Sequence, residues 1–204
     1  NRLCGSGLEA IVTAAKSLLL GECEAALAGG VESMSRAPFH LPGHRWGRKL
    51  GDDTVVDALN GALTDPFHRV LMGITAENIA ERHGIGRETQ DALALESHRR
   101  VAAAQDSGHF AAELAPLIGR DGSVHGADDG VRRDASMAGL AKLKPFFDKK
   151  YGRVTPGNSS QISDGAAWLL LASAEAVERH GLQPLGRIVD SQWAALAPEQ
   201  MGLG

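Results

Sequence analysis

A chain of 204 residues, 43% of them hydrophobic, has enough material for one large globular domain or for parts of two. The net charge of −4 gives no reason to expect nucleic-acid binding. No apolar run approaches the roughly 18 residues that span a bilayer. No signal peptide opens the chain, and its two cysteines suit a reducing compartment.

The first predicted element is an amphipathic helix that begins just after Cys4 and ends at Gly21. Its apolar residues recur at helical spacing and comprise Leu8, Ile11, Val12, Ala15, Leu18 and Leu19. Cys4 would lie where unpaired N–H groups and the helix dipole favour a thiolate, the reactive form of a thiol. Gly5 and Gly7 leave room for a reactant. We therefore interpret Cys4 as a candidate nucleophile and Cys23 as a structural residue.

The same glycines allow a second interpretation. Gly5, Gly7 and Ala10 match a loose dinucleotide-binding fingerprint, which requires a preceding strand and an acidic residue after the next strand. No such strand precedes Cys4, and Glu32 is not followed by a clear crossover helix. A dinucleotide-binding domain therefore stays as an alternative hypothesis.

A buried strand is predicted over 24–31, so a helix followed by a strand indicates a layered α/β architecture. From about residue 35, prolines and glycines break regular structure over a long excursion, which is typical of function or assembly. Within it, Pro42 and Gly43 separate His40 from His44, so no helix presents both imidazoles to a metal.

The predicted elements that follow are helices over 52–63, 72–80 and 87–107, a short strand over 114–118, a loop over 119–130, an irregular or weakly helical stretch over 132–147, a turn-rich loop over 155–160, a strand over 165–172, a helix over 173–180 and a strand over 186–193. Ser173 is expected to cap the last of these helices.

Two long runs carry a resemblance to a known family. They read Asn1-x-Leu3-Cys4-Gly5-Ser6-Gly7-Leu8 and Ala28-Gly29-Gly30-Val31-Glu32-Ser33-Met34-Ser35. Together they resemble the thiolase family, in which this cysteine takes an acyl group from a coenzyme A thioester. Further similar runs extend through nearly the whole chain.

The resemblance implies a thiolase-like layered α/β fold that is incomplete here, with an inserted helical and loop domain. Residues 1–34 would form the first part of the N-terminal α/β half, and residues 35–162 the inserted loop domain. Residues 163–204 would return to that half and start the C-terminal half. We expect the chain to be a segment that covers about the middle half of a longer protein.

The resemblance also implies the site residues. Cys4 matches the nucleophile, and its backbone N–H matches one donor of an oxyanion hole. The run from Gly157 to Ala167 resembles the loop in which Ser160 contacts the pantetheine arm of coenzyme A. Apart from the family, Ser159 and Ser160 could simply hold a turn. Three further residues, Leu63, Arg132 and Phe147, fall at positions that line the coenzyme A pocket, and Met72 falls near the acyl end. Because Arg133 follows directly, the sequence leaves open which of the two arginines matches the family's pocket residue.

The activity implied is that of an acetyl-CoA acyltransferase that cleaves 3-ketoacyl-CoA to acetyl-CoA and a shortened acyl-CoA through acyl-Cys4. It would use coenzyme A as a substrate, with no metal and no permanently bound cofactor. The family implies a homodimer or homotetramer, in the cytoplasm of a bacterium or an organellar matrix of a eukaryote. A non-catalytic acyl-CoA-binding or lipid-carrier relative is an alternative.

Leu71 stands where relatives that make acetoacetyl-CoA carry a histidine, and His68 lies three positions earlier. An apolar residue there favours longer acyl chains and the degradative direction over condensation of two acetyl-CoA molecules.

The family's activating histidine in a Gly-His-Pro run and its second cysteine in a Cys-x-Gly-Gly-Gly run do not occur in this sequence. We therefore expect residues 1–204 alone to be inactive.

Overall fold

The computed structural model describes all 204 residues, which form two compact units. Unit 1 comprises residues 1–41 and 162–195, and unit 2 comprises residues 42–161 and 196–204. Each is described by itself. None of the helices combines the length and hydrophobicity that a bilayer span requires.

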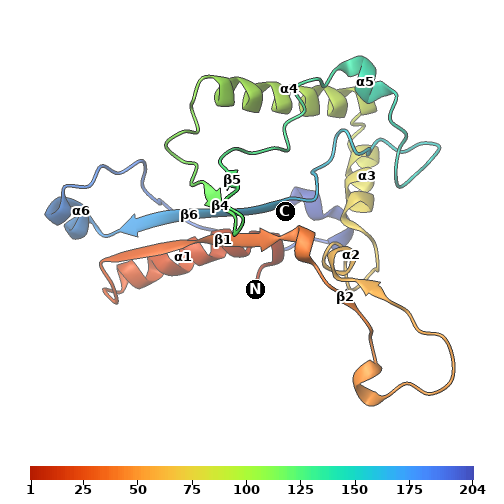
Figure 1. The fold of residues 1–204 in the computed structure, drawn as a ribbon, viewed down its shortest axis with the longest axis horizontal. Helices are drawn as coiled ribbons and strands as arrows, with labels where there is room; N and C mark the ends of the chain where they lie inside the picture. The colour runs from red at the N-terminus through yellow and green to blue at the C-terminus, as the bar shows by residue number, and fades with distance from the viewer. The chain divides into compact units, whose positions relative to one another are not determined.

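Unit 1 is built on a two-stranded antiparallel ribbon (Figure 1). Strand β1 (Ala25–Ser33) pairs along its whole length with β6 (Asp164–Ala172), from Ala25 opposite Ala172 to Ser33 opposite Asp164. Helix α1 (Ser6–Leu19), preceded by the 3₁₀ turn η1 (Leu3–Gly5), packs against β1. The remaining elements of unit 1 are η2 (Met34–Arg36), β2 (Phe39–His40) and α6 (Ala174–His180).

Glycines set how closely α1 approaches β1. A Cβ placed on Gly30 would lie 3.4 Å from the Cα of Gly7, so the two backbones are nearly in contact. Val12 on the helix and Ala28 on the strand are buried where these elements meet. Small residues therefore hold the start of α1 firmly against the ribbon.

The opposite face of the ribbon is open. Leu27, Val31, Trp168 and Leu170 share that face by the strand alternation, and all are more than half exposed. The sequence predicts a buried strand over 24–31. The structure has a strand there, β1, but most of its residues are not buried. A single helix and a single neighbouring strand cover only one of its two faces.

Helices are the main regular elements of unit 2. Its elements are η3 (His44–Trp46), β3 (Val56–Asp57), α2 (Ala58–Ala62), α3 (Met72–Arg82), α4 (Arg87–Asp106), β4 (Leu117–Ile118), β5 (Val124–His125), α5 (Met137–Ala141) and η4 (Pro198–Leu203). Its buried residues include Ala80 on α3, Leu95 on α4 and Leu140 on α5. Two buried polar residues, Thr75 and Asp91, come from the same helices.

Side-chain caps explain several boundaries. The Ser173 hydroxyl accepts a hydrogen bond from the Ala176 N–H at 3.1 Å, as expected for the cap of α6. Asp57 caps α2 in the same way through the Leu59 N–H at 2.8 Å. Because Asp57 begins that helix, the helix predicted over 52–63 is confined to Ala58–Ala62.

The strand predicted over 186–193 is wrong, because this stretch is irregular. A strand needs a neighbour to bond its backbone groups, and β1 and β6 pair only with each other. The loop predicted over 119–130 contains β5, which pairs with β4 in a small hairpin.

Candidate functional site

Cys4 lies on an exposed turn at the start of α1. It is the middle residue of η1, and its side chain is exposed. Leu3, directly before it, has a φ of 50°, a left-handed conformation that a leucine rarely adopts. This backbone conformation costs roughly 1–2 kcal/mol and must be held by its surroundings.

Side chains on either side of Cys4 hold that turn. The Asn1 Oδ1 accepts hydrogen bonds from the Leu3 N–H at 2.7 Å and from the Ser6 hydroxyl at 3.3 Å. The Ser6 Oγ accepts a further bond from the Arg2 N–H at 2.9 Å. The Asn-x-Leu-Cys-Gly-Ser run therefore has a local structural meaning: its polar residues fasten the turn that exposes the thiol.

A charged cluster borders the turn. The Arg2 Nε lies 3.5 Å from Glu9 Oε2, and the Arg2 guanidinium lies over the Trp193 ring at 4.9 Å from its centroid. Glu9 Oε2 is buried and accepts no hydrogen bond, so Arg2 is its electrostatic partner. Arg2 therefore joins the start of α1 to the 186–193 stretch of unit 1.

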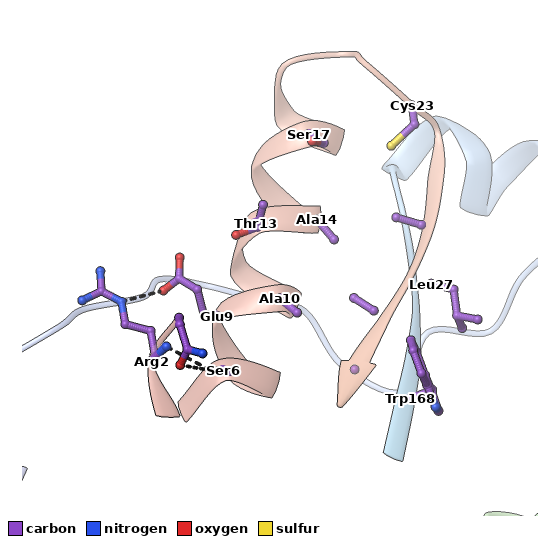
Figure 2. A pocket seen from close by; sticks show the side chains of 14 residues that line it. Arg2, Ser6, Glu9, Ala10, Thr13, Ala14, Ser17, Cys23, Leu27 and Trp168 are labelled. Carbon is purple, nitrogen blue, oxygen red and sulfur yellow. Dashed lines mark hydrogen bonds and ion pairs between the residues drawn. The ribbon is translucent and has the colours of Figure 1, made fainter. Parts of the chain in front are cut away.

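A groove of about 590 Å³ runs along α1 and β1 (Figure 2). Small residues of the helix and strand line it, with Arg2 and Glu9 toward one end and Cys23 toward the other. Cys4 is not among the lining residues. The half-buried Cys23 thus faces the groove, whereas the candidate nucleophile is presented elsewhere on unit 1.

In unit 2 the structure brings Leu63 and Met72 together. The Met72 N–H donates to the Leu63 carbonyl at 2.9 Å, and Thr64 and Leu71 form a β-bridge beside this bond. Asp65 closes the loop between them: its Oδ2 accepts from the His68 N–H at 2.6 Å and lies 3.1 Å from His68 Nδ1. These interactions with His68 lower the pKa of Asp65 below its usual value.

Phe147 packs against Gly73, the residue that follows Met72. A Cβ placed on Gly73 would collide with the Phe147 ring, so the ring contacts the backbone of the first turn of α3. Phe146 meets Phe147 edge-on, with ring centroids 5.0 Å apart. Leu63, Met72 and Phe147, which sequence reasoning placed around one ligand, therefore gather at the N-terminal end of α3.

The structure separates the roles of the two neighbouring arginines. The Arg133 guanidinium donates to the Asp106 carboxylate and to the Gln105 side-chain Oε1, each at 3.0 Å. Arg132 is fixed through its backbone N–H, which donates to His98 Nδ1 at 3.1 Å, while its guanidinium is exposed and has no protein partner. Arg132 is therefore the arginine available to a ligand.

Gly157 and Ser160 lie on a tightly folded loop. A Cβ on Gly157 would lie 2.5 Å from terminal methyl groups of Leu140 and Leu143, so a larger residue there would require these two side chains to move. The Ser160 hydroxyl is exposed and donates only to the Gln161 carbonyl, at 3.3 Å. A reactant could thus reach this hydroxyl.

Sequence reasoning missed the polar residues beneath this loop. Glu77 on α3, Asp91 on α4 and Asn158 in the loop itself form hydrogen bonds that hold it. The one available signal was Asp91 four residues after Arg87 within a helical pattern, the spacing of an ion pair.

The described chain holds no group of three or more metal-binding side chains. His44, one of the two histidines of the 40–44 stretch, is paired with Asp53. The six predicted ligand-binding residues Leu63, Met72, Arg132, Phe147, Gly157 and Ser160 all belong to unit 2, whereas Cys4 belongs to unit 1.

Comparison with known proteins places the chain in a family. A sequence profile for the thiolase N-terminal domain matches residues 1–175. Beta-ketothiolase BktB of Cupriavidus necator is 49% identical over 207 residues, which cover 100% of this chain and 52% of the relative. The chain spans about half the length of the curated relatives it matches.

Solved structures agree with the sequence match. The acetyl-CoA acetyltransferase of Bacillus anthracis superposes with a TM-score of 0.95 at 43% identity, over 100% of this chain and 52% of that one. Human mitochondrial 3-ketoacyl-CoA thiolase in complex with CoA superposes with a TM-score of 0.85 at 42% identity, over 91% of this chain and 47% of that one. The fold is that of a thiolase, and the chain belongs to the thiolase family.

Proposed function

We propose that the protein containing this chain is an acetyl-CoA C-acyltransferase that cleaves 3-ketoacyl-CoA. The Cys4 thiolate attacks the ketone carbonyl at C3 of the substrate, and the C2–C3 bond breaks. The two-carbon fragment leaves as acetyl-CoA after taking a proton, and the shortened acyl group stays on Cys4. The thiol of a second coenzyme A then attacks the thioester, which releases the shortened acyl-CoA and regenerates Cys4.

The observation that carries this proposal is the presentation of Cys4. An exposed thiol stands on a strained turn at the start of a helix, and Asn1 and Ser6 hold that turn by hydrogen bonds. Strained backbone that surrounding groups stabilise is characteristic of functional sites. Membership of the thiolase family supplies the chemistry that such a cysteine would perform.

The residues of unit 2 support coenzyme A as the ligand. The exposed Arg132 guanidinium suits a phosphate or a purine ring, through charge and planar stacking. The apolar group Leu63, Met72 and Phe147 would contact less polar parts of the ligand, and Ser160 with Gly157 would contact the pantetheine arm. The human relative whose structure holds CoA supports the same ligand for this chain.

A second candidate function is the reverse direction, condensation of two acetyl-CoA molecules. It is favoured by the names of several relatives, among them an acetyl-CoA acetyltransferase of Chromobacterium violaceum that is 46% identical. Leu71 favours the degradative direction, because an apolar side chain lies directly before Met72 where those relatives are expected to carry histidine.

The proposal is tested in the intact gene product with Cys4→Ala and, as the matched control, Cys23→Ser. We expect Cys4→Ala to lower turnover of 3-ketoacyl-CoA by at least about 10³-fold and the control to stay near wild type. Brief iodoacetamide treatment should label Cys4 before Cys23, as read by peptide mass spectrometry. Turnover that survives Cys4→Ala would reject Cys4 as the nucleophile.

A further inference from the structure

Carboxylates from two helices accept hydrogen bonds from the loop that runs from Arg153 to Ser160. Glu77 lies on α3 and Asp91 on α4, and both accept hydrogen bonds from residues between 153 and 158. The loop between them includes Val154 and Thr155, which are 9% and 1% exposed. The base of this loop is thus part of the core of unit 2, although Ser159 and Ser160 at its end are exposed.

Glu77 binds the backbone rather than a side chain. Its Oε1 accepts from the Arg153 and Val154 N–H groups, each at 2.8 Å, and its Oε2 lies 2.9 Å from the same Arg153 nitrogen. Gly152 makes room for this approach, because a Cβ there would lie 2.8 Å from Glu77 Oε1. One carboxylate therefore satisfies two consecutive amides and fixes the direction in which the chain enters the loop.

Asp91 fixes the other side of the loop through Asn158. The Asn158 amide nitrogen donates to Asp91 Oδ1 and to the Arg153 carbonyl, each at 2.9 Å. The Asn158 side-chain oxygen accepts from the Thr155 N–H at 2.8 Å. Asp91 itself is 2% exposed and accepts from Arg87 Nε at 2.7 Å. Asn158 is thereby held at three points, two residues before Ser160.

Glu81 provides an internal contrast on the same helix. It lies one turn after Glu77 and also contacts Arg153, but through the guanidinium, at 2.6 Å, and its side chain is 75% exposed. An exposed ion pair of this kind contributes little to order. Glu77 and Glu81 thus touch the same residue, and only Glu77 holds its backbone.

We propose that Glu77 is a positioning residue that fixes the Arg153–Ser160 loop in its ligand-binding conformation before coenzyme A arrives. This inference rests on the proposed function, in which that loop contacts the pantetheine arm. A loop already ordered in the free protein avoids the ordering cost on binding. Loss of the Glu77 carboxylate would therefore weaken binding of coenzyme A without changing the chemistry at Cys4.

The experiment compares Glu77→Gln with Glu81→Gln in the intact gene product, with coenzyme A as the probe. An amide at position 77 keeps the Oε1 acceptor but replaces Oε2 with an N–H₂ group, which then faces the Arg153 N–H, and it removes the negative charge. We expect the KM for coenzyme A to rise about tenfold in Glu77→Gln, with kcat at saturating coenzyme A within about twofold of wild type. Glu81→Gln should leave both constants unchanged.

A separate readout distinguishes positioning from general damage. Cys4 belongs to unit 1, so its rate of alkylation by iodoacetamide should be the same in wild type and in Glu77→Gln. An unchanged KM for coenzyme A in a folded Glu77→Gln protein overturns the inference. Absence of coenzyme A binding by the wild-type protein overturns the proposed function itself, and with it this inference.

If Glu77→Gln fails to fold, hydrogen exchange on the wild-type protein tests whether the loop is ordered before coenzyme A binds. The inference requires the Arg153 and Val154 amides to be protected in the absence of coenzyme A, because Glu77 already binds them. Fast exchange of these amides that slows only when coenzyme A is added would show that the ligand orders the loop, and would overturn the inference.

Discussion

At the scale of single residues, Asp164 shows how one carboxylate joins the two strands of unit 1. It accepts hydrogen bonds from the Ser35 N–H at 2.9 Å, from the Ser35 hydroxyl, and from the Ser33 hydroxyl at 3.2 Å. The bonds from Ser35 are the main reason that the pKa of Asp164 lies below its usual value of 3.8. The start of β6 is therefore tied to the end of β1 through an ionised group.

This tie predicts a pH-dependent stability. A carboxyl whose pKa is lowered by folding stabilises the protein above its unfolded-state pKa, and the effect is lost as the pH falls through the folded-state value. We expect Asp164→Asn to lower the free energy of unfolding by a constant amount above pH ~5, and by less as the pH falls below ~3.8. Urea denaturation of both proteins between pH 3 and 7 measures the difference.

The control for that series is Asp190→Asn. Asp190 accepts a hydrogen bond from the next residue, Ser191, and joins no second strand. A difference between wild type and Asp164→Asn that does not change with pH would show that the Asp164 charge is not what holds Ser35.

Leu71 carries a second prediction at this scale. It is the residue directly before α3, and His68 cannot replace a histidine there because its ring is bound to Asp65. We expect Leu71→His to shift the ratio of kcat/KM for a medium-chain 3-ketoacyl-CoA over that for acetoacetyl-CoA by about tenfold toward acetoacetyl-CoA. A steady-state comparison across chain lengths measures it, with His68→Ala as the control, and an unchanged ratio in Leu71→His would contradict the assigned role.

At the scale of elements, two glycines near the start of the chain have different tolerances. A Cβ on Gly29 would collide with the backbone carbonyl of Ala167, which cannot move without disturbing β6. A Cβ on Gly7 would lie 3.7 Å from Gly30, an ordinary contact. The glycine in β1 is therefore more constrained than the one in α1.

We expect Gly29→Ala to destabilise the protein by about 1–3 kcal/mol, as overpacking typically does. Gly7→Ala should change the free energy of unfolding by less than about 1 kcal/mol, because alanine favours a helix and meets no clash. Chemical denaturation of the intact protein compares the two variants. Equal destabilisation by both would contradict the packing described for β1 and β6.

The elements that the sequence predicts well are those whose signals are local. Helices α1 and α3 carry apolar residues at helical spacing, α4 is rich in alanine, which favours helices, and α6 begins at a capping serine. Their positions therefore follow from neighbouring residues. The irregular 186–193 stretch has a strand-like composition, but pairing depends on a partner that the sequence pattern does not reveal. The candidate site likewise contains residues with a local sequence signal and residues without one. Motifs indicate Cys4 and Ser160, whereas the role of Glu77 is visible only in its hydrogen bond from Arg153, 76 residues away.

At the scale of the whole molecule, each unit exposes large apolar side chains. Leu27, Val31 and Trp168 of unit 1 are more than half exposed, and so are Trp46, Leu50 and Phe67 of unit 2. Apolar area of this extent favours aggregation or a partner that covers it.

We therefore expect residues 1–204, expressed alone, to bind a hydrophobic dye, to lack a sharp cooperative melt and to show no turnover of acetoacetyl-CoA. The family's Gly-His-Pro run and second catalytic cysteine run do not occur in these residues. General acid–base help of the kind they supply is typically worth about 10²–10⁴-fold in rate. Circular dichroism, dye fluorescence and loss of enolate absorbance provide the measurements, and a cooperative melt with measurable turnover would contradict this expectation.

The pairing of β1 with β6 also has a consequence for synthesis on the ribosome. Ser33 at the end of β1 and Asp164 at the start of β6 are 131 residues apart, so β1 emerges long before its neighbour. At roughly 5–20 residues per second, β1 waits for roughly 7–26 s before β6 is available. During that time α1, which is made before β1, can already pack against it. The two adjacent glycines of β1, Gly29 and Gly30, make the waiting strand a poor nucleus for misassembly between nascent chains.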